Sequence, residues 1–179
     1  MGKLLKYISD KALYKCGGSV CHHCESEDKP IYDFYGEIID PQKAKDPELA
    51  KEEPDISEVC ADCINCGNLR RTDSEYMENT INKYSTDIAY SKEQLNYLPN
   101  IPLFLQGSDW PMCCGEWCEF QGSPESYEES KLIPNQYTYW HHGPEEWTYK
   151  HELLPESLRE VSLFLCKECG SKLFTWQFT

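Results

Sequence analysis

Four short cysteine pairs constrain this chain more than any other feature of its sequence. The pairs are Cys21-His22-His23-Cys24, Cys60-Ala61-Asp62-Cys63, Cys114-Gly115-Glu116-Trp117-Cys118 and Cys166-Lys167-Glu168-Cys169. Two thiols in so short a segment can reach one ion from a single tight turn, and two such turns complete the tetrahedral coordination that zinc prefers. We therefore predict two structural zinc ions per chain, bound by Cys21, Cys24, Cys60, Cys63, Cys114, Cys118, Cys166 and Cys169.

The order of the pairs favours one site made by the first two and another made by the last two, with an interleaved arrangement as the alternative. Reduced, buried thiols without metal are a further alternative, but the repeated short spacing argues against it. The remaining cysteines, Cys16, Cys66 and Cys113, are predicted to be small buried hydrophobic residues. Cys113 is the exception to watch, because it neighbours Cys114 and can take over its role.

The composition is acidic and aromatic. The formal net charge of the 179 residues is −14, and twelve Tyr, five Trp and six Phe supply much of the apolar surface. Each filled four-thiolate zinc site would carry a net negative charge and make the protein more acidic still. An acidic surface repels both phosphate backbones and anionic lipid heads. We therefore expect neither nucleic acid nor a membrane as a partner.

The sequence also indicates a compartment. The first residues lack the long apolar run and cleavage site of a secretory signal, and no stretch reaches the length of a membrane span. Without export, cysteines stay reduced and are available to metals rather than to disulfides. We therefore expect a cytoplasmic protein.

The pattern predicts an α+β fold built from zinc-ribbon-like and treble-clef-like modules with a few helices. Residues 31–39 read as a strand leaving the first cysteine pair, and residues 161–165 and 172–178 read as a hairpin around the last pair. We expect one compact domain over residues 1–179, with an N-terminal zinc half at about 16–98 and a C-terminal zinc-ribbon half at about 101–179.

Helical spacing of apolar residues predicts three helices. One is a short amphipathic helix within residues 1–15, a second runs from a capping box at residues 72–75 to Ile88, and a third starts at Ser91 and ends before Pro99. Residues 40–58 are polar and rich in proline, so they are predicted to form an exposed loop.

Several motifs in this order resemble the CbrC family of bacterial proteins. They are the first cysteine pair, Tyr35-Gly36, Cys60-x-x-Cys63-Ile64 with Gly67, Trp110-Pro111, Cys114-Gly115, Phe120-x-Gly122, and Leu163-Phe164-x-Cys166-x-x-Cys169-Gly170. The resemblance covers most of residues 21–170, and the polar insertion at residues 40–58 departs from it, as do Cys66 and Cys113. It implies a bacterial cytoplasmic protein associated with colicin tolerance, that is, with resistance to protein toxins.

The predicted sites argue against an enzyme. A catalytic zinc keeps an open coordination position, usually beside His or carboxylate ligands, whereas these pairs supply enough thiols to close both sites. The sequence contains neither the zinc deaminase pattern nor a glycine-rich phosphate loop. A zinc-dependent or thiol-dependent enzyme is therefore only the third hypothesis.

An acidic and aromatic tract after the third cysteine pair suggests a binding function instead. Aromatic side chains anchor interfaces, and negative charge speeds the encounter with a basic partner. We therefore predict an immunity protein that neutralises a basic, nuclease-type bacterial toxin, with a zinc-stabilised regulatory adaptor of a stress or envelope response as the alternative. The predicted contact residues are Glu125, Glu128, Glu129, Tyr137, Tyr139, Trp140, Glu145, Glu146 and Trp147.

Overall fold

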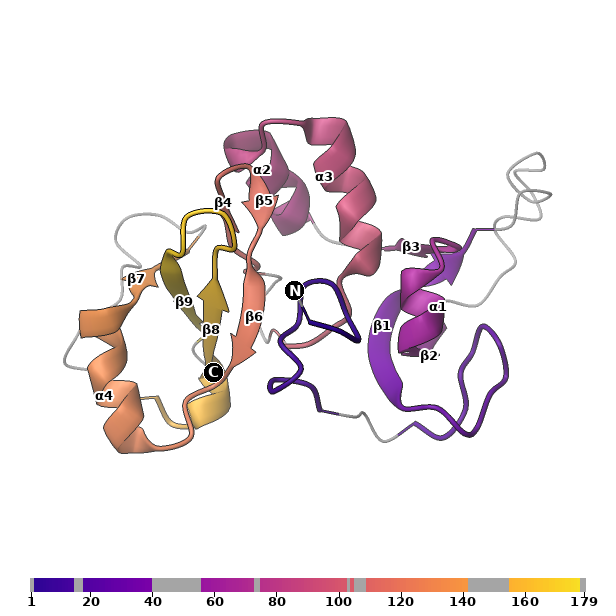
Figure 1. The fold of residues 1–179 in the computed structure, drawn as a ribbon, viewed down its shortest axis with the longest axis horizontal. Coiled ribbons are helices and arrows are strands. Elements are labelled where there is room, and N and C mark those ends of the chain that lie inside the picture. The colour runs from indigo at the N-terminus through magenta and orange to yellow at the C-terminus, as the bar shows by residue number, and fades with distance from the viewer. Residues whose placement is uncertain are drawn as a thin grey trace.

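The first cysteine pair leads into a small antiparallel sheet (Figure 1). Strand β1 (Ile31–Ile38) is its centre, as the β-forming residues of this run predict. Strand β2 (Ile56–Cys60) pairs with one edge of β1 and strand β3 (Leu69–Arg71) with the other. Helix α1 (Ala61–Asn65) follows β2 without a linker, so the second cysteine pair spans a strand end and a helix start.

The computed structural model describes most of the chain. The described residues are 2–14, 18–39, 56–72, 75–102, 104, 109–141 and 155–177. Of the predicted loop at 40–58, only residues 56–58 are among them, and they belong to β2, so the loop prediction is wrong there. Cys16, Glu145, Glu146 and Trp147 lie outside the described residues.

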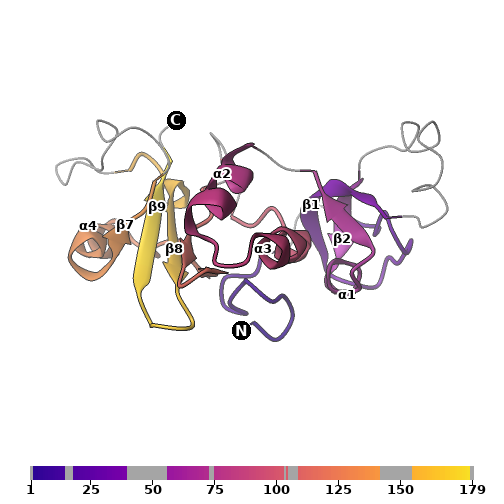
Figure 2. The same ribbon diagram turned by 90° about the horizontal axis from the view of Figure 1, so that it is seen from above.

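Two helices lie between this three-stranded sheet of β1, β2 and β3 and a four-stranded sheet in the C-terminal half (Figures 1 and 2). Helix α2 (Glu75–Tyr84) buries Met77 and Ile81, but it ends before Ile88, so the predicted length is too great. Helix α3 (Ile88–Gln94) begins before Ser91, because the carboxylate of Asp87 accepts a hydrogen bond from the amide of Tyr90 and caps the helix there. A short 3₁₀ helix, η3 (Leu95–Tyr97), continues it.

The C-terminal half is built on a four-stranded sheet with the order β6-β8-β9-β7. Its strands are β6 (Glu119–Gly122), β7 (Thr138–Tyr139), β8 (Val161–Leu165) and β9 (Lys172–Trp176). The hairpin of β8 and β9 around the last cysteine pair confirms the prediction. A short 3₁₀ helix, η5 (Leu158–Glu160), precedes β8.

Two further elements complete this half. Strands β4 (Met112–Cys113) and β5 (Glu116–Trp117) form a small separate hairpin before β6. Helix α4 (Tyr127–Gln136) starts at Ser126, whose hydroxyl accepts a hydrogen bond from the amide of Glu129. The sequence does not predict α4, because it buries only a narrow stripe that contains Ser130 and Ile133.

The N-terminal segment is not the predicted helix. Residues 2–14 form turns, and Leu5, Ile8 and Ala12 are buried. The segment lies between the two sheets (Figure 1), where Ile8 forms a parallel bridge with Phe120 of β6. On the other side, the side-chain amide of Asn65 donates a hydrogen bond to the carbonyl of Leu4 at 2.8 Å. The apolar residues therefore pack against the body as expected, but from irregular backbone.

One continuous core joins the two halves, and it contains residues of both sheets and of the N-terminal segment. Its C-terminal part is aromatic. The ring centroids of Trp110 and Phe164 lie 5.7 Å apart in the edge-to-face geometry that aromatic pairs favour, and those of Phe120 and Phe164 lie 5.6 Å apart with tilted planes. The core also includes several of the cysteines, among them Cys21, Cys60, Cys63 and Cys166.

Candidate metal centres

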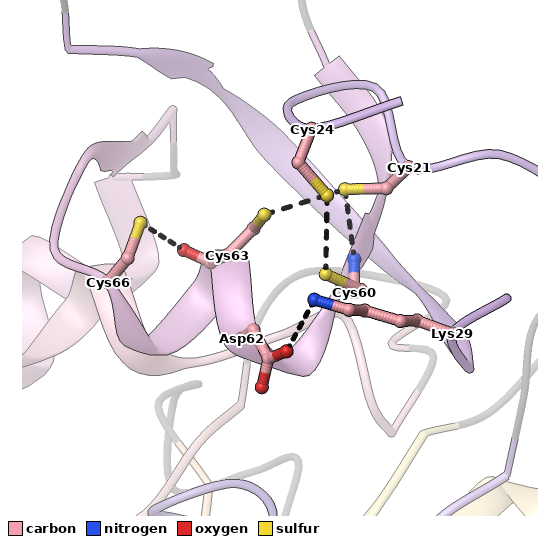
Figure 3. A network of polar contacts seen from close by, with 7 residues as sticks. All are labelled: Cys21, Cys24, Lys29, Cys60, Asp62, Cys63 and Cys66. Carbon is pink, nitrogen blue, oxygen red and sulfur yellow. Dashed lines mark hydrogen bonds and ion pairs between the residues drawn. The ribbon is translucent and has the colours of Figure 1, made fainter. Parts of the chain in front are cut away.

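The first cysteine group joins the first two cysteine pairs, as predicted (Figure 3). Cys21 and Cys24 lie in a tight turn before β1, while Cys60 is the last residue of β2 and Cys63 lies in α1. The sulfur of Cys21 lies 3.7 Å from that of Cys63, and the sulfur of Cys24 lies 3.9 Å from that of Cys60. All four sulfurs lie within 4.8 Å of one another.

The turns at Cys21–Cys24 and Cys166–Cys169 have the same backbone geometry. The amide of Glu25 donates to the carbonyl of Cys21 at 2.8 Å, and the amide of Gly170 donates to that of Cys166 at 3.0 Å. Both donors have positive φ, 57° for Glu25 and 74° for Gly170. Glycine adopts this conformation at little cost, which explains Gly170 after the last pair. The two turns therefore present their thiols in the same way.

The second cysteine group contains Cys113, Cys114, Cys166 and Cys169, whose sulfurs also lie within 4.8 Å of one another. It joins the third and fourth segments, as predicted, but it uses Cys113 and not Cys118. The sulfur of Cys113 lies 3.9 Å from that of Cys114 and 3.6 Å from that of Cys169. The prediction of Cys118 as a ligand is therefore corrected.

The β4–β5 hairpin explains this correction. Cys113 pairs with Glu116, so Cys114 and Gly115 form the turn between them, with φ of 55° and 81°. This two-residue turn holds both Cys113 and Cys114 at the tip. The amide of Cys118 donates to the carbonyl of Pro111 at 2.9 Å. Cys118 therefore lies two residues back along the hairpin, roughly 7 Å from the tip at the usual strand rise.

The sulfur separations fit a tetrahedral metal site. With metal–sulfur bonds of about 2.3 Å, the edges of a tetrahedron of four thiolates measure about 3.8 Å. The closest sulfur pairs lie 3.7 and 3.9 Å apart in the first group and 3.6 and 3.9 Å apart in the second. Each group therefore presents four soft donors within 4.8 Å of one another, with its closest pairs at the separation that a tetrahedral ion requires.

The thiol pKa values show why such groups favour a cation. Burial alone would raise the pKa of Cys21, but hydrogen bonds from backbone amides, including that of Cys60 at 3.3 Å, lower it to about 7. Burial and the neighbouring sulfurs raise the pKa of Cys63. In the second group, hydrogen bonds from Ser171 lower the pKa of Cys169 to about 6, while burial and neighbouring sulfurs raise that of Cys113. A bound dication would relieve the repulsion between such thiolates.

A basic side chain accompanies the first group. The ammonium of Lys29 lies beside it and 2.7 Å from a carboxylate oxygen of Asp62 (Figure 3). The pKa of Lys29 is raised, first by this hydrogen bond to Asp62 and then by the nearby charges of Cys60 and Cys24. Lys29 therefore offsets part of the negative charge that four thiolates bring together.

The cysteines outside the two groups have different surroundings. Cys66 is exposed, and its thiol donates to the carbonyl of Cys63 at 2.9 Å instead of facing the other sulfurs (Figure 3). Cys66 is therefore not the buried hydrophobic residue that the sequence predicts. Cys118 is buried in the core, where burial raises its pKa. A glycine follows the last cysteine of the group in both turns, as Cys114-Gly115 and as Cys169-Gly170. This shared dipeptide is the sequence signal that Cys114 is the last cysteine of its turn, which leaves Cys113 rather than Cys118 as the other member.

The predicted contact residues fall into two classes. Glu125, Glu128 and Glu129 are exposed at the start of α4. Tyr137, Tyr139 and Trp140 are half-buried instead. The ring centroid of Trp140 lies 4.4 Å from that of Tyr84, and the ring centroid of Tyr139 lies 5.2 Å from that of Phe174. The exposed apolar side chains of α4 are instead Tyr127, which is 46% exposed, and Leu132, which is 53% exposed.

Comparison with known proteins adds no relative. The chain matches no family model, no curated protein and no solved structure. The resemblance to the CbrC family, the cytoplasmic location and the role in toxin resistance therefore stay predictions. Each helix in the described part of the chain is too short or too polar to cross a membrane.

Proposed function

We propose that this protein binds two structural zinc ions and acts by binding another protein, without catalysing a reaction. The observation that carries the proposal is the closed donor set. In each group the four sulfurs lie within 4.8 Å of one another, and two of their separations match the edge length of a tetrahedral site. With all four positions taken by protein, a bound ion would have no position for a substrate or an activated water.

Zinc is the proposed ion because a tetrahedral set of four cysteine thiolates is typical of structural zinc sites. The first site would be treble-clef-like, since its ligands come from a turn and, beyond a β-hairpin, from the start of α1. The second would be zinc-ribbon-like, since its ligands come from the ends of two hairpins, β4–β5 and β8–β9. Both ions would fix connections that the small sheets alone hold weakly.

The proposed partner is a basic bacterial toxin domain. The net charge of −14 favours encounter with a positively charged protein and disfavours nucleic acid. The exposed carboxylates of Glu125, Glu128 and Glu129 gather at one end of α4, beside the exposed ring of Tyr127. An acidic surface with an exposed aromatic residue can block a nuclease-type toxin by occupying the basic surface that binds its substrate. This makes an immunity protein the function that we propose.

The test is a titration at low salt against the toxin encoded beside this gene, with calorimetry as the readout. Glu128→Lys should weaken binding, because it reverses the charge of an exposed carboxylate that now pairs with Lys131 at 2.7 Å. Glu78→Lys on α2 is the matched control, since Glu78 is also an exposed helical glutamate that pairs with a lysine, Lys92. Equal affinities for both variants would reject α4 as the contact surface, and no binding to the toxin would reject the immunity function.

A regulatory adaptor is the second candidate, and one observation favours it. Helices α2 and α3 expose apolar side chains outside the acidic region, among them Tyr76 at 46% and Ile88 at 49%. Such residues can anchor a protein partner. An adaptor gene would have no toxin gene beside it, and Ile88→Ser rather than Glu128→Lys would reduce capture of the partner.

A further inference from the structure

The two cysteine groups differ in how far solvent reaches them. In the first group Cys21, Cys60 and Cys63 are buried, and only Cys24 is exposed. In the second group Cys114 and Cys169 are exposed, Cys113 is partly exposed, and only Cys166 is buried. Oxidation of cysteine depends on access to the thiolate. A small oxidant can therefore approach the second group at two sulfurs and the first group at one.

The exposed sulfurs of the second group also have a partner at reaction distance. The sulfur of Cys113 lies 3.6 Å from that of Cys169 and 3.9 Å from that of Cys114. A disulfide between the adjacent residues Cys113 and Cys114 would close a small ring that contains their own peptide bond and would strain its planarity. A bond between Cys113 and Cys169 carries no such constraint, because these residues come from different hairpins.

We propose that the second group is an oxidation site for hydroperoxides, at which a Cys113–Cys169 disulfide forms while the first group stays reduced. The metal ion that this step would release is the proposed second zinc ion, and this part of the inference rests on the proposed function. The disulfide itself requires only the cysteine geometry. The probe that represents the oxidant class is hydrogen peroxide.

The proposed oxidation has two steps. The exposed thiolate of Cys169 attacks one oxygen of hydrogen peroxide, the O–O bond breaks, and one water leaves after protonation, so that Cys169 becomes a sulfenic acid. The sulfur of Cys113 then attacks the Cys169 sulfur and displaces the hydroxyl group, which leaves as a second water. Two electrons pass from the two sulfurs to the peroxide, and a metal ion held by this group would lose two of its four cysteine ligands.

The new disulfide would hold together the same two segments that a metal ion would connect in the reduced protein. In the reduced protein a metal ion would connect the tip of the β4–β5 hairpin to the turn between β8 and β9. In the oxidised protein the Cys113–Cys169 bond would connect the same two segments, while Cys114 and Cys166 keep free thiols. Oxidation is therefore expected to release one ion without unfolding the chain.

The test uses the full-length, zinc-loaded protein. Hydrogen peroxide is added stepwise, released zinc is measured with a metal-sensitive dye, and free thiols are alkylated before tandem mass spectrometry. We expect one of the two ions to leave first, together with a peptide in which Cys113 is bonded to Cys169. The four cysteines of the first group should still be alkylated at that stage. A first disulfide within Cys21, Cys24, Cys60 and Cys63, or simultaneous release of both ions, would overturn the proposal.

Two controls separate this inference from the proposed function. Cys118→Ser should leave the Cys113–Cys169 disulfide unchanged, and a first disulfide that contains Cys118 in the wild-type protein would contradict the inference. The zinc content before oxidation tests the proposed function separately. A protein with fewer than two zinc ions but with the Cys113–Cys169 disulfide would retain the oxidation site and reject the two-zinc proposal.

Discussion

The ammonium of Lys167 lies 2.6 Å from a carboxylate oxygen of Glu119, whose side chain is only 5% exposed. Lys167 stands between Cys166 and Cys169 in the last turn, and Glu119 opens β6. The side-chain amide of Gln121 donates to the same carboxylate, also at 2.6 Å. This buried carboxylate therefore connects the turn that carries Cys166 and Cys169 to the neighbouring strand.

Replacing Glu119 should destabilise the protein. Glu119→Gln keeps the size of the side chain but removes the charge that Lys167 and Gln121 contact, and hydrogen bonds to charged groups contribute about 1.5–3 kcal/mol. We expect a loss of that order in the free energy of unfolding, measured by urea denaturation with zinc in excess. Glu168→Gln is the control, because Glu168 is an exposed glutamate of the same turn. An equal loss in both variants would contradict this role of Glu119.

The difference in the free energy of unfolding between wild type and Glu119→Gln should depend on pH, and the pKa of Glu119 determines how. Burial alone would raise this pKa, but the hydrogen bonds from Lys167 and Gln121 outweigh it, so the pKa in the folded protein lies below the ordinary value of 4.5. The stabilisation is then fully present above the unfolded pKa and is lost as the pH falls through the folded pKa. The difference between wild type and Glu119→Gln should therefore stay constant from about pH 7 to pH 5. If urea titrations show it shrinking in this range, the pKa of Glu119 is raised instead.

The N-terminal segment should be essential for stability. Ile8 is buried where this segment meets β6, and truncation of a buried isoleucine to alanine costs about 2–5 kcal/mol. Thermal or urea unfolding of Ile8→Ala should show such a loss. Leu4→Ala is the neighbouring control, because Leu4 is exposed and its truncation should change the free energy of unfolding by no more than about 0.5 kcal/mol. A small effect of Ile8→Ala would mean that the segment does not pack between the sheets.

Removal of metal should unfold at least part of the chain. Binding of a structural zinc ion to four thiolates contributes about 10–16 kcal/mol, which exceeds the stability of a small domain. Addition of a strong chelator should therefore reduce the circular dichroism signal of the folded protein and expose the buried Trp110 and Trp117 to solvent. Unchanged tryptophan fluorescence after complete metal removal would contradict the structural role of the ions.

The parts of this fold that the sequence predicts are those with strong local signals. The strand β1, the β8–β9 hairpin and the grouping of cysteine pairs follow from β-forming runs and from thiol spacing. The turns of residues 2–14 do not follow, because Leu5, Ile8 and Ala12 have helical spacing but are fixed by contacts with distant strands. Tertiary contacts therefore decide where local spacing is ambiguous.

The ligand at the third cysteine pair shows the same limit. Spacing alone favours Cys114 and Cys118, which form a short pair like the other three. The choice depends on the turn of a two-stranded hairpin, and this turn places Cys113 and Cys114 at the tip. The spacing of the cysteines alone does not reveal this turn, because it depends on the pairing of β4 with β5 rather than on the thiols. The residue that signals the turn is Gly115, with its positive φ of 81°.

The most direct test of the central claim is the zinc content of two matched variants, Cys113→Ser and Cys118→Ser, measured by native mass spectrometry beside the wild-type protein. The two residues are five positions apart at the same hairpin, but only Cys113 belongs to the second group. We predict two zinc ions in wild type and in Cys118→Ser and one in Cys113→Ser. A Cys118→Ser protein that loses one ion while Cys113→Ser keeps both would contradict the account.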